Sequence, residues 1–230
     1  MKNNRRMSLS LTVISFLCVF SIATVAFCRA GPKPAGAESA PEEGFVDLLF
    51  VKGEGYTKSN WNHSGNGCFS LERETGVLTS HSGGGLLWYA ARQFKDFVLE
   101  LEYMTEEETA NSGIFLRMPN VPVAGNYIPE SFEIQIFDSM RGGELHTTGA
   151  IYDCEPPVKK ASLGPGKWNH FKITFEGLHL VVELNGEVIN DWMAEPRGKV
   201  LSHWPEGYIG VQNHDGRSSI KFRNIRIKEL

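Results

Sequence analysis

The segment SFEIQIFD, residues 131–138, alternates apolar and polar side chains. The apolar residues that begin with Phe132 share one parity, and the polar residues Glu133 and Gln135 share the other. Successive side chains of a β-strand point to opposite faces of the sheet. The alternation therefore predicts a strand with one buried face and one polar face.

The same period of two recurs along the chain, and no long stretch has helical periodicity. Further strands are predicted in DFVLELEYM (96–104), NSGIFLRM (111–118), WNHFKITFEG (168–177) and LHLVVELNGEVIND (178–191). Asn185 and Gly186 lie between alternating hydrophobic residues and predict a type I′ hairpin turn, because both tolerate positive φ. This pattern predicts an all-β fold, an antiparallel β-sandwich.

The C-terminal segment GYIGVQNHDGRSSIKFRNIRIKEL (207–230) predicts another hairpin, which turns at Asp215 and Gly216. Its apolar parity changes near Asn224, which indicates a β-bulge there. The glycine-rich segment SGGGLLWYA (82–90) predicts a flexible turn into a strand that presents Trp88 rather than a phosphate-binding loop.

The N-terminal residues 1–30 have the pattern of a secretory signal: a basic start, an apolar run and a small-residue cleavage site. An uncleaved membrane anchor is the alternative, because the apolar run approaches the length of a span. Lipidation at Cys28 is disfavoured by the bulky Phe27 before it. Residues 31–43 predict a disordered linker and residues 44–230 the folded domain, exported to the periplasm or the extracellular space. Membrane contact is expected only if the N-terminal segment is uncleaved or lipidated.

The charge balance argues against a nucleic-acid partner. The chain has 23 Lys and Arg against 27 Asp and Glu, a formal net charge of −4. Residues 1–30 hold four basic residues and no acidic one, so their removal leaves −8. An acidic surface repels phosphate backbones. The two cysteines outside the N-terminal segment, Cys68 and Cys154, predict one disulfide in an exported protein.

Three predicted strands suggest a shared polar face. If they are neighbours in one sheet, this face collects Glu100, Glu102, Asn111, Arg117, Glu133 and Gln135, with Phe115 and Phe137 between them. Carboxylates and amides bind sugar hydroxyls while aromatic rings cover sugar C–H faces, so the set is typical of a carbohydrate cleft. An ordinary solvated face of a sandwich is the alternative.

Long loops and histidines add little chemistry by themselves. The loops 119–130, 139–148 and 153–167 are long for a sandwich and are expected to border one end or one face of the sheet.

The seven histidines have no metal-ligand spacing. His214 shares the polar parity of its strand and is either a candidate site residue or a hydrogen-bonded surface histidine.

Ten segments occur in the order found in one known family. They are GFVDLLF (44–50), GGLLWY (84–89), DFVLELEY (96–103), NSGIFLR (111–117), FEIQIFD (132–138), TGAIYD (148–153), WNHFKITFEG (168–177), LNGEVIND (184–191), GYIGVQNH (207–214) and FRNIRIKEL (222–230). The chain resembles the 3-keto-disaccharide hydrolase domain family, also described as 3-keto-glucoside-1,2-lyase and 3-keto-2-hydroxyglucal hydratase. The resemblance implies a concanavalin A-like jelly-roll sandwich and an oxidised glycoside or disaccharide as substrate.

The resemblance also implies a chemistry. A ketone at C3 acidifies the hydrogen on C2, so a base can remove it, the enolate can expel the aglycone, and water can add back. We expect Glu133 to be the base and Arg117 to stabilise the enolate. Asp138 or His214 is expected to be the proton donor. The sequence requires no cofactor, although a divalent metal could replace Arg117 as the electrophile.

The remaining candidates are expected to bind the sugar. They are Glu102, Asn111, Gln135, Trp88 and Phe115. Two other functions stay open: a laminarinase-like glycosidase, whose paired carboxylates would have to include Glu133 and Asp138, and a non-catalytic carbohydrate-binding module.

Overall fold

The computed structural model describes residues 43–195 and 204–230. The predicted signal segment 1–30 and the linker up to residue 42 lie outside the described residues. Within them, no helix has both the length and the apolar character needed to cross a membrane. All described residues fall in one unit, residues 41–230.

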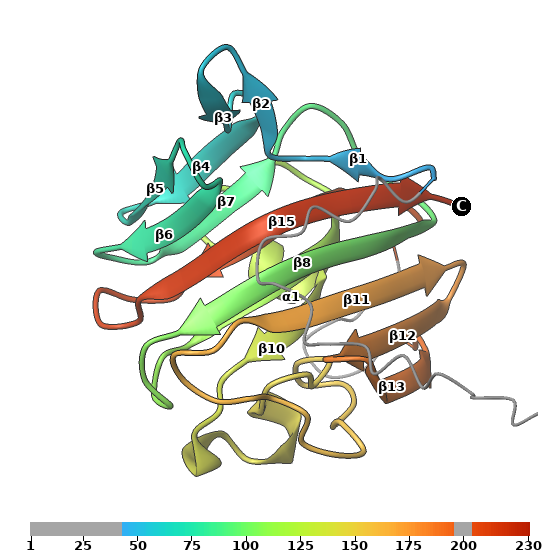
Figure 1. Ribbon diagram of the computed structural model, residues 1–230. Helices are drawn as coiled ribbons and strands as arrows, with labels where there is room; N and C mark the ends of the chain where they lie inside the picture. The colour runs from blue at the N-terminus through green and yellow to red at the C-terminus, as the bar shows by residue number, and fades with distance from the viewer. Residues whose placement is uncertain (1–42, 196–203) are drawn as a thin grey trace, which may run out of the picture. The chain divides into compact units, whose positions relative to one another are not determined.

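Two antiparallel sheets form a sandwich, which confirms the predicted architecture (Figure 1). The larger sheet has the order β13-β12-β11-β8-β15-β6-β5, and β1 also pairs with β15. Its strands are β1 Val46–Asp47, β5 Cys68–Glu72, β6 Val77–His81, β8 Phe97–Thr105, β11 Asn169–Glu176, β12 His179–Leu184, β13 Glu187–Met193 and β15 Ile220–Glu229.

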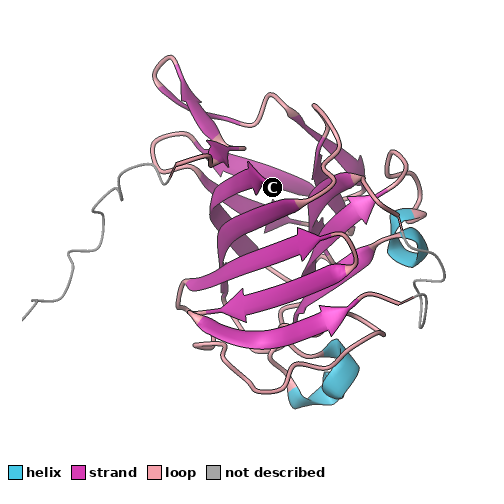
Figure 2. Ribbon diagram, turned by 90° about the vertical axis from the view of Figure 1, so that its right-hand side faces the viewer, coloured by secondary structure: helices cyan, strands magenta, loops and turns pink. Residues whose placement is uncertain are grey.

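The second sheet has five strands in the order β10-β9-β14-β7-β4. They are β4 Trp61–Gly65, β7 Gly85–Tyr89, β9 Ser112–Met118, β10 Phe132–Ile136 and β14 Tyr208–Asn213. A separate hairpin joins β2 Phe50–Lys52 to β3 Gly55–Thr57. The short helices α1 Tyr127–Glu130, η1 Met140–Gly142 and η2 Glu144–His146 lie in the loops around β10 (Figure 2).

Local turn chemistry predicted two details correctly. Asn185 and Gly186 join β12 to β13 with φ of 55° and 82°, as a type I′ turn requires. Asn224 has φ of 52° at a register shift between Arg223 and Arg226, which confirms the bulge.

The predicted C-terminal hairpin is wrong. β14 pairs with β7 and β9 in the five-stranded sheet, whereas β15 pairs with β8, β6 and β1 in the other. The turn at Asp215 and Gly216 therefore carries the chain from one sheet to the other. Each strand places its apolar face in the same core, so the sequence pattern of the two strands is the same as that of a hairpin.

The shared polar face predicted for three strands is also wrong. β9 and β10 are neighbours, but β8 belongs to the opposite sheet. Both sheets direct apolar residues inward, such as Leu101 from β8 and Ile134 from β10, which belong to one core cluster. Their polar faces consequently point to opposite sides of the sandwich.

The predicted disulfide is not formed between the described cysteines. Cys68 is exposed in β5, whereas Cys154 is buried after the bridge at Ile151. Two cysteines in an exported chain favoured pairing on chemical grounds, but the fold places one thiol at the surface and the other in the core.

We expect the stability of the domain to depend on pH through His63. Burial lowers the pKa of His63, and the nearby charge of Lys58 lowers it further. The neutral ring is thus favoured in the folded state, so its contribution is complete above the ordinary value of 6.5 and is lost as the pH falls through the lowered value. In urea unfolding at pH 7.5 and 5.0, His63→Phe should lose less stability on acidification than the parent. Equal losses in both proteins would contradict this account.

Candidate active site

A row of side chains crosses the outer face of the five-stranded sheet. Glu133 of β10 pairs with Phe115 of β9, Phe115 with Gly210 of β14, and Gly210 with Trp88 of β7. On the other side of β10, the Tyr152 amide donates to the Glu133 carbonyl at 2.9 Å, next to the bridge between positions 134 and 151. The row therefore begins with a phenol and a carboxylate and ends at an indole.

The carboxylate of Glu133 rests on a glycine. A Cβ added to Gly113 would lie 2.2 Å from Glu133 Oε1 and 2.7 Å from its Cγ. Gly113 pairs with Gln135, which lies two residues after Glu133 in β10 and therefore on the same face of the sheet. Only a residue without a side chain leaves this space, and Glu133 keeps 4% of its surface exposed.

Two amides lie beside the carboxylate. The Gln135 amide is 3.1 Å from the Asn111 amide. With its nitrogen turned toward Glu133, Gln135 donates to Oε1 at 3.2 Å and to the Ser112 carbonyl at 3.3 Å. The sequence predicted that Glu133, Gln135 and Asn111 lie together, and the structure confirms this.

The negative charge of Glu133 acts on two tyrosine side chains, Tyr127 and Tyr152. Burial, followed by the charge of Glu133, raises the pKa of Tyr127. Burial and the charges of Asp153 and Glu133 raise the pKa of Tyr152. Both hydroxyls are therefore held in the protonated form, in which they can donate a hydrogen bond or a proton.

An imidazole–carboxylate pair lies against Tyr152. The His146 ring stacks on the Tyr152 ring with centroids 4.4 Å apart. Its Nε2 contacts Asp153 Oδ1 at 2.5 Å, and its Nδ1 contacts the Gly142 carbonyl at 2.9 Å. Both ring nitrogens therefore face acceptor oxygens, which fixes the orientation of the ring.

Together these groups form a site with the parts of an acid–base reaction. Glu133 is a carboxylate that can accept a proton beside amide donors, and the Tyr152 hydroxyl across the strand from it can donate one, with His146 stacked on its ring. The carboxylate and amide oxygens of Glu133, Gln135 and Asn111 are also of the type that divalent cations prefer. Among residues 43–195 and 204–230, no three His, Cys, Asp or Glu side chains cluster as a metal site.

Gly113→Ala should lower activity without unfolding the domain. The new methyl group would occupy the place of the Glu133 carboxylate and force it to move, because the overlap involves the Cγ and carboxyl carbon as well as one oxygen. We expect a loss in kcat of at least about tenfold, as misplacement of a catalytic group can cost ~10²-fold. Steady-state kinetics and thermal unfolding measure the two effects. Gly53→Ala is a control for backbone strain alone: a Cβ there meets nothing within 4 Å, but φ is 67°, so the variant should lose some stability and keep its kcat.

Arg117 is not in the candidate site, and its predicted placement is wrong. It has φ of 51° at the irregular end of the β9–β14 pairing, so its side chain turns inward. The guanidinium is fully buried and lies 3.6 Å from the centroid of Phe175. It donates to the carbonyls of Lys95, Gly177 and Phe175 and to Asp96 Oδ1. Burial lowers the pKa of Arg117 to about 10 although Asp96 raises it, so the cation persists at neutral pH.

Glu102 is also outside the site, because β8 is in the other sheet. It accepts from Arg223 Nε at 2.7 Å and from Asn224 Nδ2 at 2.6 Å. Glu100, on the same outer face, pairs with Arg226 at 2.6 Å. Both carboxylates therefore belong to ion pairs of the eight-stranded sheet rather than to a sugar cleft.

Asp138 lies beyond β10 and connects two loops. Its Oδ1 accepts from Thr148 Oγ1 at 2.6 Å, and its Oδ2 accepts from Ser162 Oγ at 2.7 Å. It lines a cavity of about 170 Å³ with these residues and Lys160. Burial and the charge of Asp138 raise the pKa of Tyr103 on the core side of β8. These contacts favour a structural role for Asp138 over the predicted role of proton donor.

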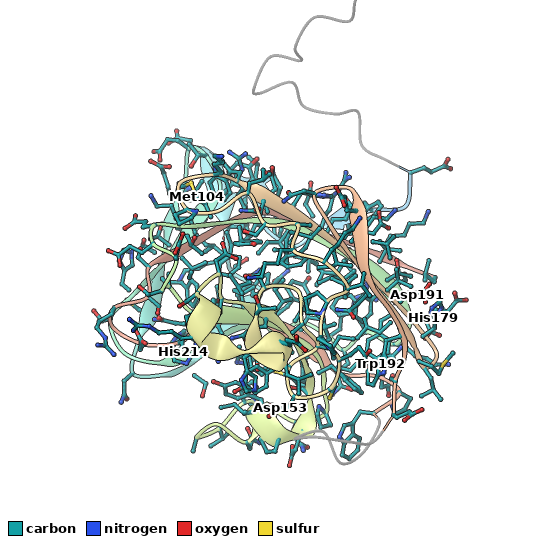
Figure 3. The ribbon with its side chains drawn as sticks, turned by 90° about the horizontal axis from the view of Figure 1, so that it is seen from below. Met104, Asp153, His179, Asp191, Trp192 and His214 are labelled. Carbon is teal, nitrogen blue, oxygen red and sulfur yellow. The ribbon has the colours of Figure 1, made fainter. Side chains whose placement is uncertain are left out.

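His214 is exposed one residue beyond β14. Its Nδ1 contacts Asp215 Oδ2 at 3.0 Å. Partial burial alone would raise the pKa of Asp215, but hydrogen bonds from Arg217, His214 and Ser218 lower it to about 2. In Figure 3, His214 lies apart from Asp153. The exposed pair of His179 and Asp191 lies at another edge of the molecule. The pairing with Asp215 agrees with the surface alternative for His214.

The two aromatic candidates lie on the predicted face. Phe115 is fully buried because Tyr127 of α1 covers it edge-on at 4.9 Å. Phe115 therefore supports the floor of the site and cannot stack directly on a sugar. Trp88 is 6% exposed and packs against the half-buried Tyr208 at 4.9 Å.

The sequence interpretation missed Tyr127, His146, Tyr152 and Asp153. Two signals were available: the long loops 119–130 and 139–148, and the segment TGAIYD that ends at Asp153. None of these residues lies in a predicted strand, so alternation could not assign them to a face. The pairing of residues 150–152 with β10 brings Tyr152 next to Glu133.

Comparisons with known proteins agree on a carbohydrate-active sandwich. Residues 47–228 match the model of the 3-keto-alpha-glucoside-1,2-lyase-like domain. Two crystal structures from Parabacteroides distasonis ATCC 8503, provisionally assigned as glycosyl hydrolases, are similar. The first has 27% identity and TM-score 0.65 over 81% of this chain and 99% of that chain. The second has 20% identity and TM-score 0.66 over 82% and 94%.

More distant structures share the fold alone. A carbohydrate binding module of Bacillus subtilis has 13% identity and TM-score 0.52, over 74% of this chain and 96% of that chain. The carbohydrate recognition domain of Emp46p, in its potassium-bound form, has 14% identity and TM-score 0.52, over 80% and 95%. These neighbours confirm the concanavalin A-like sandwich. The curated proteins give no match.

Proposed function

Because the chain belongs to the 3-keto-alpha-glucoside-1,2-lyase-like domain family, we propose that it cleaves glycosides whose sugar carries a ketone at C3. The observation that carries this proposal is the buried Glu133 carboxylate between the Gln135 amide and the Tyr152 phenol. A C2–H next to a ketone needs a base, a donor for the enolate oxygen and an acid for the leaving group.

Glu133 would take the C2 proton, and the electron pair would form the enolate. Collapse of the enolate breaks the bond from C1 to the aglycone oxygen and leaves a C1–C2 double bond. Tyr152 would protonate the departing oxygen. Water added across C1 and C2 then gives the free 3-keto sugar, so elimination followed by hydration amounts to hydrolysis.

The enolate donor proposed here differs from the one expected from sequence. Arg117 is committed to Asp96 and three carbonyls, and the Gln135 amide donates to Glu133 and to the Ser112 carbonyl, so the donors left on the outer face are the Asn111 amide and the Tyr152 hydroxyl. A preorganised donor of this kind typically contributes ~10²–10³-fold to kcat. A divalent metal held by Glu133, Gln135 and Asn111 could supply the same stabilisation when bound.

The Glu133 carboxylate is buried, so a substrate cannot reach it without movement of the protein. Glu133 is 4% exposed, and Tyr127 covers the neighbouring Phe115. A sugar ring can reach the carboxylate only if the side chains that cover Glu133 move on binding. The expected export of the chain would place this reaction in the periplasm or outside the cell.

The test compares a 3-keto-glucoside with its unoxidised parent, in D₂O and with or without a chelator. The proposal expects aglycone release from the keto compound alone and deuterium at C2 of the product. Release from the parent glucoside would indicate an ordinary glycosidase instead. Binding of either sugar without turnover would indicate a carbohydrate-binding module. Loss of turnover with the chelator, restored by a divalent cation, would identify the metal as the electrophile.

The glycosidase alternative receives little support from the geometry. A retaining glycosidase needs two carboxyl groups about 5–5.5 Å apart. On the outer face of β10, Glu133 is followed at the same parity by the amide Gln135, and Asp138 is held by Thr148 and Ser162. The other nearby acid, Asp153, contacts His146.

A further inference from the structure

A second hollow lies far from Glu133, between the β2–β3 hairpin and β5. It has a volume of about 580 Å³, and its lining includes Lys52, Tyr56, Lys58, Ser70 and Arg73. In Figure 1 the hairpin lies at the top of the view, whereas β10 lies toward the bottom. The hollow is thus separate from the candidate active site.

The walls of this hollow are built by specific contacts. The Tyr56 amide donates to the Arg73 carbonyl at 2.8 Å, which connects β3 to the turn after β5. A Cβ added to Gly55 would lie 2.7 Å from the same carbonyl oxygen. The Tyr56 ring lies so close to Gly76 that a Cβ there would be 2.9 Å from it. The hairpin is therefore held in place by close backbone approach.

The hollow concentrates positive charge on an acidic protein. Three cations line it, and none of the described residues in its lining is a carboxylate. The ammonium of Lys58 is positioned by donation to the Phe69 carbonyl at 2.7 Å. Its charge also contributes, after burial, to the lowered pKa of His63. Like charges gathered in one concave site repel one another, and an anionic ligand would relieve this repulsion.

The other lining groups suit a sugar. Thr57 offers a hydroxyl, Ser70 offers one that also contacts His81 Nε2 at 2.6 Å, and the half-buried Tyr56 offers part of an aromatic ring. Aromatic faces pack against sugar C–H groups, and hydroxyls exchange hydrogen bonds with sugar hydroxyls. The hollow is open to solvent, and its volume of about 580 Å³ far exceeds that of a single ion.

We propose that this hollow binds an acidic oligosaccharide, through carboxylate or sulfate groups held by Lys52, Lys58 and Arg73. The site would bind an anionic glycan at a distance from the reaction centre. It does not depend on the function proposed for Glu133, because no residue is shared between the two sites.

Isothermal titration calorimetry of the full chain tests this site with four probes. They are tetragalacturonate, a sulfated disaccharide, neutral maltotetraose and inorganic phosphate. We expect at least one acidic saccharide to bind with much higher affinity than maltotetraose and phosphate. The saccharide that binds identifies the anionic group as a carboxylate or a sulfate. Equal binding of maltotetraose, equal binding of phosphate, or no binding of the acidic saccharides would overturn the proposal.

Charge-matched variants separate this site from general electrostatics. Lys52→Gln with Arg73→Gln removes two exposed charges from the hollow, and binding should weaken at least about tenfold for each charge-assisted hydrogen bond that is removed. Lys95→Gln with Lys167→Gln removes the same net charge from exposed positions elsewhere. An equal decrease in affinity in both double variants would also overturn the proposal. Hydrolysis of the 3-keto-glucoside should be unchanged in both.

Discussion

Glu133→Gln is expected to lower kcat on a 3-keto-glucoside by ~10²–10⁴-fold, the usual contribution of a positioned base. Glutamine has nearly the same shape, so it can keep its place over Gly113 and its contact with Gln135, but it cannot accept a proton at neutral pH. The free energy of unfolding should change much less than the rate. Steady-state kinetics and urea unfolding of the purified protein measure these two quantities.

A second signature of Glu133→Gln comes from the phenols. The charge of Glu133 contributes to the raised pKa values of Tyr127 and Tyr152. Its removal should therefore shift part of the tyrosine titration, followed by absorbance, toward lower pH. Glu130→Gln is a suitable control because this carboxylate, only three residues away, is bonded to Asn120 on the surface. Full turnover in Glu133→Gln would exclude Glu133 as the base.

Arg117→Met is expected to have the largest effect on stability. Methionine keeps much of the volume but removes a buried cation with hydrogen bonds to Asp96 and three carbonyls. Removal of one partner from a buried, hydrogen-bonded ion pair typically costs about 3–5 kcal/mol. This is a large fraction of the roughly 5–15 kcal/mol by which domains are stable. Thermal unfolding should show a midpoint lower by about 10 °C.

Arg117→Lys is the matched variant, because it keeps the charge but cannot form the same fork of donors. We expect it to be intermediate in stability, and its kcat at a temperature where it is folded should be close to that of the parent. If Arg117→Met instead unfolds like the parent and loses turnover, the enolate role expected from sequence is correct and the structural role is wrong. Measured together, stability and turnover therefore distinguish a guanidinium in the core from one in the active site.

Strand positions were predictable because alternation depends on local geometry. The strand around Glu133, the turn at Asn185 and Gly186, and the bulge at Asn224 each follow from backbone preferences of a few residues. The adjacency of Glu133, Gln135 and Asn111 also followed, because β9 and β10 are joined by one connection and pair directly.

Sheet membership was not predictable in the same way. β8 and β9 follow each other in the chain and have the same pattern, but they belong to opposite sheets. A sandwich core receives the apolar faces of both sheets, so parity alone does not tell which sheet a strand joins. Glu102 was consequently assigned to the wrong side of the molecule.

The sequence by itself determined an all-β sandwich, its strand positions and an outward-facing carboxylate at Glu133, because these depend on a period of two and on turn chemistry. Only the tertiary structure decided that Arg117 turns into the core and that Tyr152, with His146 stacked on its ring, lies next to Glu133. A positive φ reverses a side chain without changing the residue pattern, and loop residues acquire a neighbour only through long-range backbone pairing.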